Sequence, residues 1–279
     1  MKVLFVGNSK KDDTLALGKS IIKNLLELDL EVFVNEEVYH INNTKMINEN
    51  NLLVIDFGVV LGGDGTILKF AREYHEHEIP IYGINLGRVG ALATGELDNY
   101  LDDIKEIIKK NYRVEKHNSI LCEIVGSTTK ELYAFNDITI HRGDSLSLLG
   151  VDITFNNRLI SPIYADGLLF STSTGSSAYN QSARGPLLLN STHSFVMTPI
   201  CPQFLAFSSV VFSEEDEICL KVKNEHAFIS VDGTDKVIID SNDVIFIRKA
   251  KYNLALIKFD KEELLYSSIY KIAKSIYKE

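Results

Sequence analysis

The stretch that decides the fold is Val59–Thr66, VVLGGDGT. It joins a run of apolar residues to a glycine-rich turn, and a segment with apolar residues at helical spacing begins at Ile67. The apolar run starts as early as Leu53, although Asp56 and Gly58 interrupt it. This order predicts a buried strand, a tight turn and a helix.

The residue types in this turn favour phosphate chemistry. Gly62, Gly63 and Gly65 let the backbone approach a ligand closely, because no Cβ is in the way. The helix that follows offers unpaired N–H groups and the positive end of its dipole. Asp64 would repel phosphate unless it binds Mg²⁺ or accepts a proton, so the turn predicts phosphoryl transfer to a hydroxyl with Asp64 as base or metal partner. An ordinary strand–helix turn with a capping aspartate is the alternative.

Length and composition limit the class of protein. The 279 residues are typical of two domains, each able to bury its own core. A net charge of −9 argues against a broad nucleic-acid-binding surface. Cys122, Cys201 and Cys219 are far apart and lack metal-site spacing, which indicates buried, reduced thiols and a cytoplasmic location. The amino terminus becomes polar too soon for a signal peptide, and no apolar run could span a bilayer, so we expect neither nucleic acid nor membrane as a partner.

Residues 1–112 alternate between strand and helix patterns. Short strands at Val3–Val6, Glu31–Val34 and Ile79–Ile84 join the central strand, and amphipathic segments separate them. This alternation predicts an α/β domain with a parallel sheet and helices on both faces. A second glycine-rich turn, Asn85–Leu92, should lie beside GGDGT if the two preceding strands are neighbours.

Two other stretches of this domain carry weaker signals. Asn35–Asn51 is polar and poorly periodic, which indicates a loop with at most a short helix. His75-Glu76-His77-Glu78 resembles a set of metal ligands, but alternating positions at a helix end do not converge. We therefore expect a solvated helix terminus and no metal site there.

From Tyr112 to about Phe259 the pattern changes to short β-type runs separated by Gly, Asn, Asp and Ser turns. The runs are Ser119–Val125, Glu131–Ile140, Gly150–Phe155, Gly167–Ser171, Ser208–Phe212, Glu217–Lys223, Ala227–Val231, Lys236–Ile239, Asp243–Arg248 and Leu254–Phe259. This spacing predicts an antiparallel all-β domain over residues 113–256. Residues 257–279 are mostly helical with an apolar stripe that must be buried, so we expect this C-terminal segment to return to the first domain.

The β domain holds a second unusual stretch. A dense run of hydroxyl residues, Ser171–Ser177, lies between Ala165-Asp166-Gly167 and Ala178-Tyr179-Asn180. Small hydroxyl groups can bind sugar or phosphate oxygens, and Tyr179 offers a face for base stacking. A Ser/Thr-rich capping loop is the alternative. The pair Asn136-Asp137 interrupts an apolar strand and suits a ribose diol, although a bulge satisfied by backbone would explain it equally.

Taken in order, these motifs resemble the NAD kinase family: GGDGT, GINLGRVGALATGE, Asn136-Asp137, ADG followed by STSTGSSAYN, and Asp232-Gly233. The resemblance covers nearly the whole chain. GGDGT alone is shared with diacylglycerol, sphingosine and related lipid kinases, whereas STSTGSSAYN singles out NAD kinases. The resemblance implies phosphorylation of the 2′-hydroxyl of the adenosine ribose of NAD to give NADP, with ATP or polyphosphate as donor. It also implies Mg²⁺ or another divalent metal carried by the nucleotide, and a homodimer or homotetramer.

The family's site residues transfer onto matching positions of this chain. Asp64 would be the proton acceptor. The phosphate-facing loop would comprise Gly62, Gly63, Gly65 and Thr66, with the basic residue Lys69 one helical turn on. Asn136 and Asp137 would bind the adenosine part of NAD, and Asp166 would contact its nicotinamide end. The adenine and ribose wall would comprise Thr174, Ser177, Ala178, Tyr179, Asn180, Gln181 and Ser182.

Four positions depart from the family pattern. Ser173 stands where a proline is usual, Ala91 where an aromatic residue is usual, Tyr164 where a basic residue is frequent, and Thr234 where a longer polar residue is common. The carboxylates are intact, so we expect the reaction to persist and the departures to affect affinity and donor choice. A non-catalytic NAD(P)-binding sensor is the alternative from another class. A lipid kinase would share GGDGT but would have no reason to keep Asn136-Asp137 or the hydroxyl-rich stretch.

Overall fold

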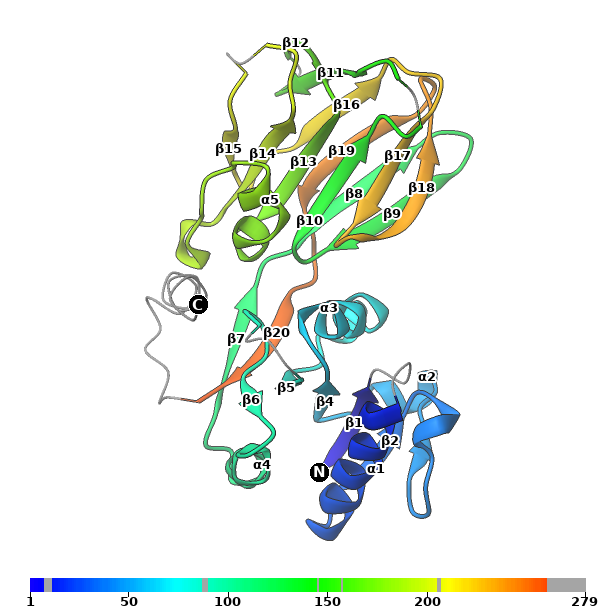
Figure 1. The fold of residues 1–279 in the computed structure, drawn as a ribbon, viewed down its shortest axis with the longest axis vertical. Helices are drawn as coiled ribbons and strands as arrows, with labels where there is room; N and C mark the ends of the chain where they lie inside the picture. The colour runs from blue at the N-terminus through cyan, green and yellow to red at the C-terminus, as the bar shows by residue number, and fades with distance from the viewer. Residues whose placement is uncertain (8–11, 87–89, 145, 157, 205–206, 260–279) are drawn as a thin grey trace. The chain divides into compact units, whose positions relative to one another are not determined.

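The computed structural model describes residues 1–7, 12–86, 90–144, 146–156, 158–204 and 207–259 (Figure 1). The chain divides into two compact units. The first comprises Met1–Lys116 and takes up the chain again at Leu254, and the second is His117–Asn253. Each unit has a hydrophobic core of its own.

The first unit is built around a sheet with strand order β3-β2-β1-β4-β5-β20-β7, and β6 pairs with β5. In this sheet the neighbouring strands from β3 to β20, and the β5–β6 pair, run parallel. Its strands are β1 (Lys2–Gly7), β2 (Glu31–Val34), β3 (Lys45–Met46), β4 (Phe57–Leu61), β5 (Ile81–Asn85), β6 (Gly95–Glu96), β7 (Arg113–His117) and β20 (Leu254–Lys258). Its helices are α1 (Asp12–Glu27), α2 (Glu49–Leu52), α3 (Asp64–Glu73) and α4 (Tyr100–Ile108), with short 3₁₀ turns η1 (Glu37–Tyr39) and η2 (His75–His77).

Helices cover both faces of this sheet, which confirms the predicted α/β class. Helices α1 and α4 pack on the face that includes Val59 and Leu61 of β4. Helix α3 lies on the opposite face, because Gly58 and Gly83 present no side chain there and face Phe70 and Ile67 of that helix. The glycine in the apolar run of β4 therefore makes room for a helix and does not break the strand.

The structure corrects two expectations for the first unit. The central strand begins at Phe57, whereas Leu53 and Val54 follow α2 and are 80% and 45% exposed. Residues 254–258 do not belong to the all-β domain, because Leu256 of β20 aligns in parallel with Ile81 of β5. Sequence periodicity identified this strand but could not identify its partner. The helix expected within 260–279 lies outside the described residues.

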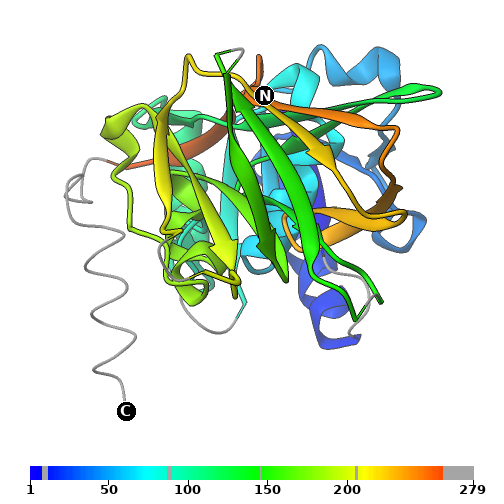
Figure 2. The ribbon, with the colours of Figure 1, turned by 90° about the horizontal axis from the view of Figure 1, so that it is seen from above.

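The second unit is a sandwich of two six-stranded antiparallel sheets, in the orders β15-β14-β13-β10-β17-β18 and β12-β11-β16-β19-β8-β9. Figure 2 shows its strands, coloured green to orange, from a second direction. The strands are β8 (Ile120–Val125), β9 (Thr129–Ala134), β10 (Asp137–His141), β11 (Leu149–Phe155), β12 (Arg158–Ala165), β13 (Gly167–Thr172), β14 (Ser194–Ile200), β15 (Val210–Ser213), β16 (Ile218–Val222), β17 (Ala227–Val231), β18 (Thr234–Ile239) and β19 (Val244–Lys249). Short helical turns η3 (Thr174–Ser177), α5 (Tyr179–Ser182) and η4 (Asn190–Thr192) follow β13.

Alternate residues of both sheets meet in one core, as the period of two in a strand requires. The expected single strand Glu131–Ile140 is two strands, because β9 ends at Ala134 and β10 begins at Asp137 in the other sheet. The chain therefore changes sheets at Phe135 and Asn136. Strands β12 and β14 were not predicted.

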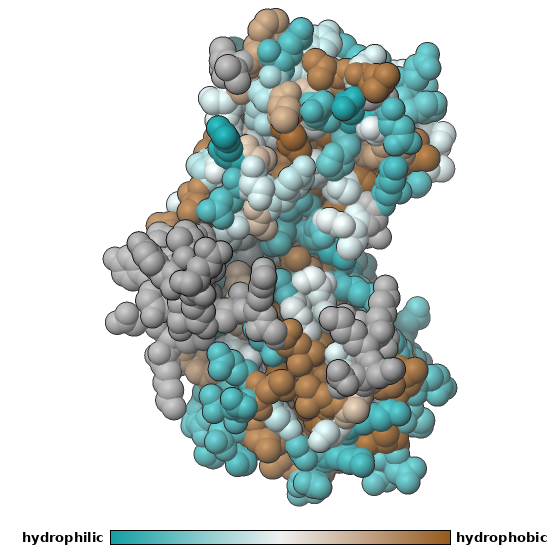
Figure 3. Space-filling model, in the orientation of Figure 1, coloured by the Kyte–Doolittle hydropathy of each residue, from teal (hydrophilic) through white to brown (hydrophobic). Residues whose placement is uncertain are grey.

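The surface of the described part of the chain is mixed. On the face drawn in Figure 3, hydrophobic residues form a larger patch on the α/β unit and are scattered among hydrophilic residues on the β unit. Among the described helices, none is both long enough and apolar enough to cross a bilayer.

Two leucines test the position of the sandwich core. Leu168 of β13 is 1% exposed within it, whereas Leu146 is 97% exposed. Leu168→Ala should lower the free energy of unfolding by about 2–5 kcal/mol, because it removes buried methyl groups and leaves a cavity. Leu146→Ala is the matched control and should change it by less than about 0.5 kcal/mol. Denaturant unfolding measures both, and equal effects would contradict the assigned core.

Candidate active site

The loop after β4 places Asp64 at the start of a helix. The strand is buried along its length, and the Gly62 N–H donates to the Ile84 carbonyl of β5 at 3.0 Å. A Cβ at Gly62 would lie 2.8 Å from the Thr66 Cβ, so the tight turn requires glycine. Gly63 is the N-cap residue of α3 and has no side chain to cap it. Asp64 is therefore the first residue of α3, where the helix dipole favours a negative charge.

The Asp64 carboxylate is held by the second glycine-rich loop. The Ala91 N–H donates to Oδ2 at 2.8 Å, and the Leu92 N–H donates to Oδ1 at 3.1 Å. This contact confirms that the loops after β4 and β5 are neighbours. The sequence predicted a base or metal partner at Asp64 and did not predict these donors. Each carboxylate oxygen has a second lone pair, so the group can still accept a hydrogen bond from a substrate hydroxyl.

The other predicted residues of this loop lie around Asp64 in sequence. Gly65 and Lys69 are exposed, and Thr66 is half-buried with its N–H donating to the Gly63 carbonyl at 2.9 Å. Asp64 itself is half-buried. The loop is thus open enough to meet a ligand and is anchored in the sheet through Gly62.

In the second unit, Asp232 holds the Asn136-Asp137 turn. Its carboxylate accepts hydrogen bonds from the backbone N–H groups of Phe135 at 3.3 Å, Asn136 at 2.7 Å and Asp137 at 3.1 Å. Its own N–H donates to the Asp137 carbonyl at 2.8 Å. Asp232 has a φ of 48°, a left-handed conformation that aspartate adopts more readily than most residues. The backbone at the turn is therefore satisfied, and the half-buried Asn136 side chain is not needed for that purpose.

The hydroxyl-rich segment packs directly on the same turn. The Thr172 N–H donates to the Asn136 carbonyl at 2.9 Å, and its hydroxyl donates to the Phe135 carbonyl at 2.8 Å. A Cβ at Gly175 would lie 2.6 Å from the Asn136 Cα, so this approach requires glycine. The structure thus brings together two motifs that the sequence predicted to share a ligand.

Within the hydroxyl-rich segment, the side chains divide into two groups. Ser171, Thr172, Ser173 and Ser176 are buried, and the Ser176 hydroxyl donates to the Ser173 carbonyl at 2.6 Å. This group fits the structural alternative, a capping loop. Thr174, Ser177, Ala178 and Tyr179 are half-buried or exposed, as are Gln181 and Ser182 at the end of α5, so these side chains can meet a ligand.

Asn180 differs from its neighbours because it is fully buried. Its amide nitrogen donates to the carbonyls of Ser176 at 3.2 Å and Pro186 at 2.9 Å. Its amide oxygen accepts from the Thr198 hydroxyl at 2.7 Å. These bonds join α5 to β14 through the Asn180 amide. The buried side chain therefore stabilises the segment that carries the exposed residues Ala178 and Tyr179.

Asp166, between β12 and β13, pairs with a cation that the sequence analysis missed. Arg142 Nε lies 2.9 Å from Asp166 Oδ1, and the Arg142 N–H donates to the Asp166 carbonyl at 3.2 Å. Both side chains are partly exposed, so the pair contributes little to stability. It orients the carboxylate and offsets its charge.

Comparison with known proteins gives consistent matches. The model of the ATP-NAD kinase N-terminal domain matches residues 3–112, and that of the C-terminal domain matches residues 135–259. An NAD kinase of Thermoanaerobacter pseudethanolicus is 33% identical over 92% of this chain and 93% of its own length. One of Clostridium tetani is 32% identical over 94% of each. The chain belongs to the NAD kinase family.

Two solved structures share the fold. An NAD kinase from Archaeoglobus fulgidus in complex with ATP is 27% identical, with a TM-score of 0.78, and the match covers 98% of this chain and 99% of that one. Yeast NADH kinase complexed with NADH has a TM-score of 0.87 at 23% identity, covering 99% of this chain and 87% of that one. The second likeness concerns the fold alone.

The structure shows the conformation or contacts of three of the four positions that depart from the expected family pattern. Ser173 has a φ of −58°, which is the value a proline would impose, so serine keeps the turn without the ring. Tyr164 lacks the charge of a basic residue, but the Lys223 ammonium lies 5.9 Å from the centre of its ring. The Thr234 hydroxyl donates to the Val231 carbonyl at 3.1 Å, which closes the turn after Asp232.

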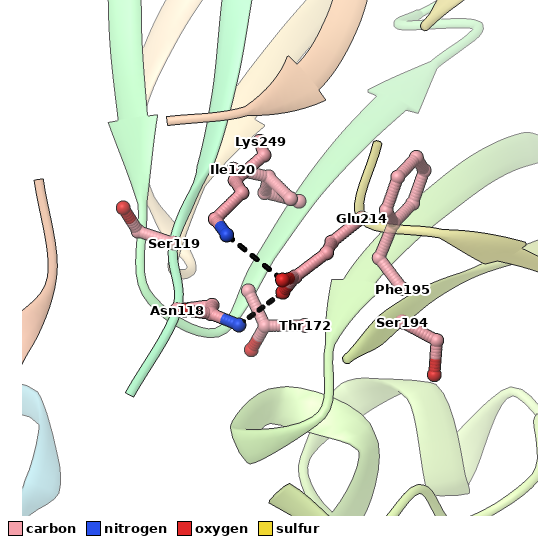
Figure 4. A pocket seen from close by; sticks show the side chains of 8 residues that line it. All are labelled: Asn118, Ser119, Ile120, Thr172, Ser194, Phe195, Glu214 and Lys249. Atoms are coloured by element: carbon pink, nitrogen blue, oxygen red, sulfur yellow. Dashed lines mark hydrogen bonds and ion pairs between the residues drawn. The ribbon is translucent and has the colours of Figure 1, made fainter. Parts of the chain in front are cut away.

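A small cavity in the second unit, next to Thr172, is a structural feature. Its volume is about 10 Å³, the space of about one water. Figure 4 shows Lys249 and Asn118 converging on the Glu214 carboxylate, with the Lys249 ammonium 2.8 Å away. These side chains come from three segments of the sandwich. The cavity that they line is too small for a nucleotide.

The pKa of the carboxyl of Asp137, one of the predicted binding residues, is raised in the folded protein. Asp137 is 5% exposed, and burial raises the pKa of its carboxyl to about 7. The Asp232 carboxylate acts in the same direction, whereas the Thr139 hydroxyl lowers the pKa. The neutral and charged forms are therefore both populated near neutral pH.

Asp137→Asn should reveal this titration as a pH-dependent stability difference. Folding raises the pKa of this carboxyl from 3.8 to about 7. The contribution of this group to the free energy of unfolding is therefore fully present below about pH 4, and it is lost as the pH rises through about 7. The variant keeps a neutral side chain at every pH. As the pH rises from about 4 to about 7, the free energy of unfolding of the variant should increase relative to that of wild type by up to about 4 kcal/mol. Melting temperatures at a series of pH values measure this, with the exposed Asp144→Asn as control, and a difference independent of pH would contradict it.

Proposed function

We propose that this protein is an NAD kinase, which transfers a phosphoryl group from ATP or polyphosphate to the 2′-hydroxyl of the adenosine ribose of NAD and releases NADP. Membership of the family supports the reaction. The observation that carries the assignment is the Asp64 carboxylate, fixed at the first turn of α3 by two main-chain donors and still able to accept a further hydrogen bond.

In the proposed reaction, Asp64 accepts the proton of the 2′-hydroxyl as that oxygen attacks the terminal phosphorus of the donor. The bond between this phosphorus and its bridging oxygen breaks, and the shortened donor leaves with the electron pair. General-base help of this kind contributes about 10²–10⁴-fold. Positioning of the two substrates and stabilisation of charge on the transferred group supply most of the remainder.

We assign the phosphate-facing loop to Gly62, Gly63, Gly65 and Thr66, with Lys69 as the nearby cation. The exposed Gly65 and the first turn of α3 suit an anion, because helix N-termini present N–H groups and a positive dipole. This arrangement favours a donor with several phosphates, which both ATP and polyphosphate provide.

We assign NAD binding to the second unit. Asn136 and Asp137 would hold the adenosine ribose, and Asp166, oriented by Arg142, would face the nicotinamide end. The accessible side chains of the wall are Thr174, Ser177, Ala178, Tyr179, Gln181 and Ser182. Asn180 would shape that wall from its buried position and not contact the ligand.

Magnesium would enter with the phosphates of the donor and offset their charge. In the described part of the chain, no group of three or more His, Cys, Asp or Glu side chains is arranged to hold a metal ion. We further propose a homodimer or homotetramer, and a cytoplasmic location, where NAD, ATP and reduced thiols coexist. The three thiols are free, but the expectation that all are buried is wrong: Cys122 is buried, whereas Cys219 is half-buried and Cys201 is exposed.

Purified protein incubated with NAD, Mg²⁺ and either ATP or polyphosphate should form NADP, measured by a coupled dehydrogenase assay. Replacing NAD by diacylglycerol tests the lipid-kinase alternative. Failure with both donors, in a protein that binds NAD in a calorimetric titration, would overturn the proposed activity and favour the non-catalytic sensor.

Asp64→Asn should lower kcat by at least about 100-fold, because it removes the proton acceptor. The dissociation constant for NAD should stay within about threefold of wild type, since the NAD-binding residues are assigned to the other unit. Steady-state kinetics and a binding titration measure the two quantities. An unchanged kcat would show that Asp64 is not the base.

A further inference from the structure

We propose that the segment Gly90–Leu92 is the positioning element of the catalytic carboxylate, and that Gly90 is required because any side chain there would displace Asp64. This inference rests on the proposed function and adds residues to its machinery. The segment acts through two main-chain N–H groups and through the absence of a side chain at Gly90. Neither feature appears in the sequence as a polar residue.

The two hydrogen bonds fix the orientation of the carboxylate plane. Ala91 N–H binds one oxygen at 2.8 Å and Leu92 N–H binds the other at 3.1 Å. Two donors on adjacent residues, one for each oxygen, restrain rotation about the bond to the carboxyl carbon. A carboxylate held in this way presents its remaining lone pairs in constant directions.

Gly90 lies against the same carboxylate. A Cβ built at this position would collide with Oδ1 and would lie 2.9 Å from Cγ of Asp64. Contacts of that kind require the carboxylate or the loop to move. Glycine at position 90 therefore permits the close approach that the two N–H donors need.

The segment is anchored on its C-terminal side. The Thr94 N–H donates to the Gly83 carbonyl of β5 at 3.2 Å, and its hydroxyl donates to the Ile257 carbonyl of β20 at 2.8 Å. Gly95 then pairs in parallel with Ile84. Because β5 and β20 belong to the central sheet, the donors to Asp64 are fixed to the same scaffold as Asp64 itself.

A competing conformation explains why such restraint is useful. Asp64 begins α3, and an aspartate near a helix N-terminus is attracted to the first-turn N–H groups and the positive end of the dipole. A carboxylate turned toward its own helix would also occupy the place of phosphate. The donors of the second loop offer an alternative set of hydrogen bonds and keep the carboxylate where a hydroxyl can reach it.

Two variants test the proposal by different routes. Gly90→Ala introduces the collision, and Ala91→Pro removes the N–H that binds Oδ2 without adding an atom at position 90. Each should lower kcat by about 100-fold, the loss expected from misplacing a catalytic group by about 1 Å. The KM for NAD, the KM for ATP and the calorimetric dissociation constant for NAD should each stay within threefold of wild type.

Gly18→Ala is the matched control. Gly18 lies in α1, and a Cβ there would lie 2.5 Å from Cε1 of the Tyr39 ring, so this variant creates a collision of similar severity away from Asp64. It should lower the melting temperature and leave kcat within twofold of wild type. A general loss of stability would lower the active fraction of all three variants alike, whereas loss of positioning affects kcat in the first two.

The outcomes separate the two proposals. A wild-type kcat in folded Ala91→Pro and Gly90→Ala would overturn the positioning role and leave the kinase assignment intact. A proportional rise of KM and fall of kcat in both variants would also overturn it, because that result indicates a general distortion. Absence of NADP formation by the wild-type protein would overturn the kinase assignment first. If Gly90→Ala does not fold, Ala91→Pro decides.

Discussion

Strands β4 and β5 are hydrogen-bonded neighbours in a parallel sheet, and the site in the first unit depends on this pairing. Parallel strands end at the same edge of a sheet, so the loop after each strand meets the other. The Gly62 N–H binds the Ile84 carbonyl, and Ala91 and Leu92 reach Asp64. A carboxylate on a lone strand–helix turn would have only its own helix as a partner. The neighbouring loop therefore fixes the orientation of the Asp64 carboxylate.

The second unit solves a similar problem in a different way. The chain changes sheets at Phe135 and Asn136, which leaves the backbone without a regular strand partner there. Asp232 supplies acceptors for three N–H groups, and Thr172 satisfies the carbonyls of Phe135 and Asn136. Because backbone groups at the turn are paired in this way, the half-buried side chain of Asn136 is not needed to satisfy them.

Two positions that depart from the expected family pattern act through their main chain. Ser173 keeps the φ of proline, so the backbone path, and not the ring, is what the position requires. Ala91, where the family resemblance led us to expect an aromatic residue, contributes its N–H to Asp64. At both positions the contribution that the structure shows is made by the main chain.

The sequence alone determined the α/β and all-β classes, the strand–turn–helix around GGDGT and the family, because periodicity and local motifs report burial and turns directly. Tertiary structure decided the partners: β20 joins the first sheet, β9 and β10 lie in different sheets, Asn180 is turned inward, and Arg142 pairs with Asp166. It also decided that Ala91, 27 residues from Asp64, holds the Asp64 carboxylate, and that Asp232, 96 residues from Asn136, holds the Asn136-Asp137 turn. A sequence pattern records that a residue is buried or polar. It does not record which distant segment supplies the hydrogen-bond partner, because that depends on how the folded sheets align.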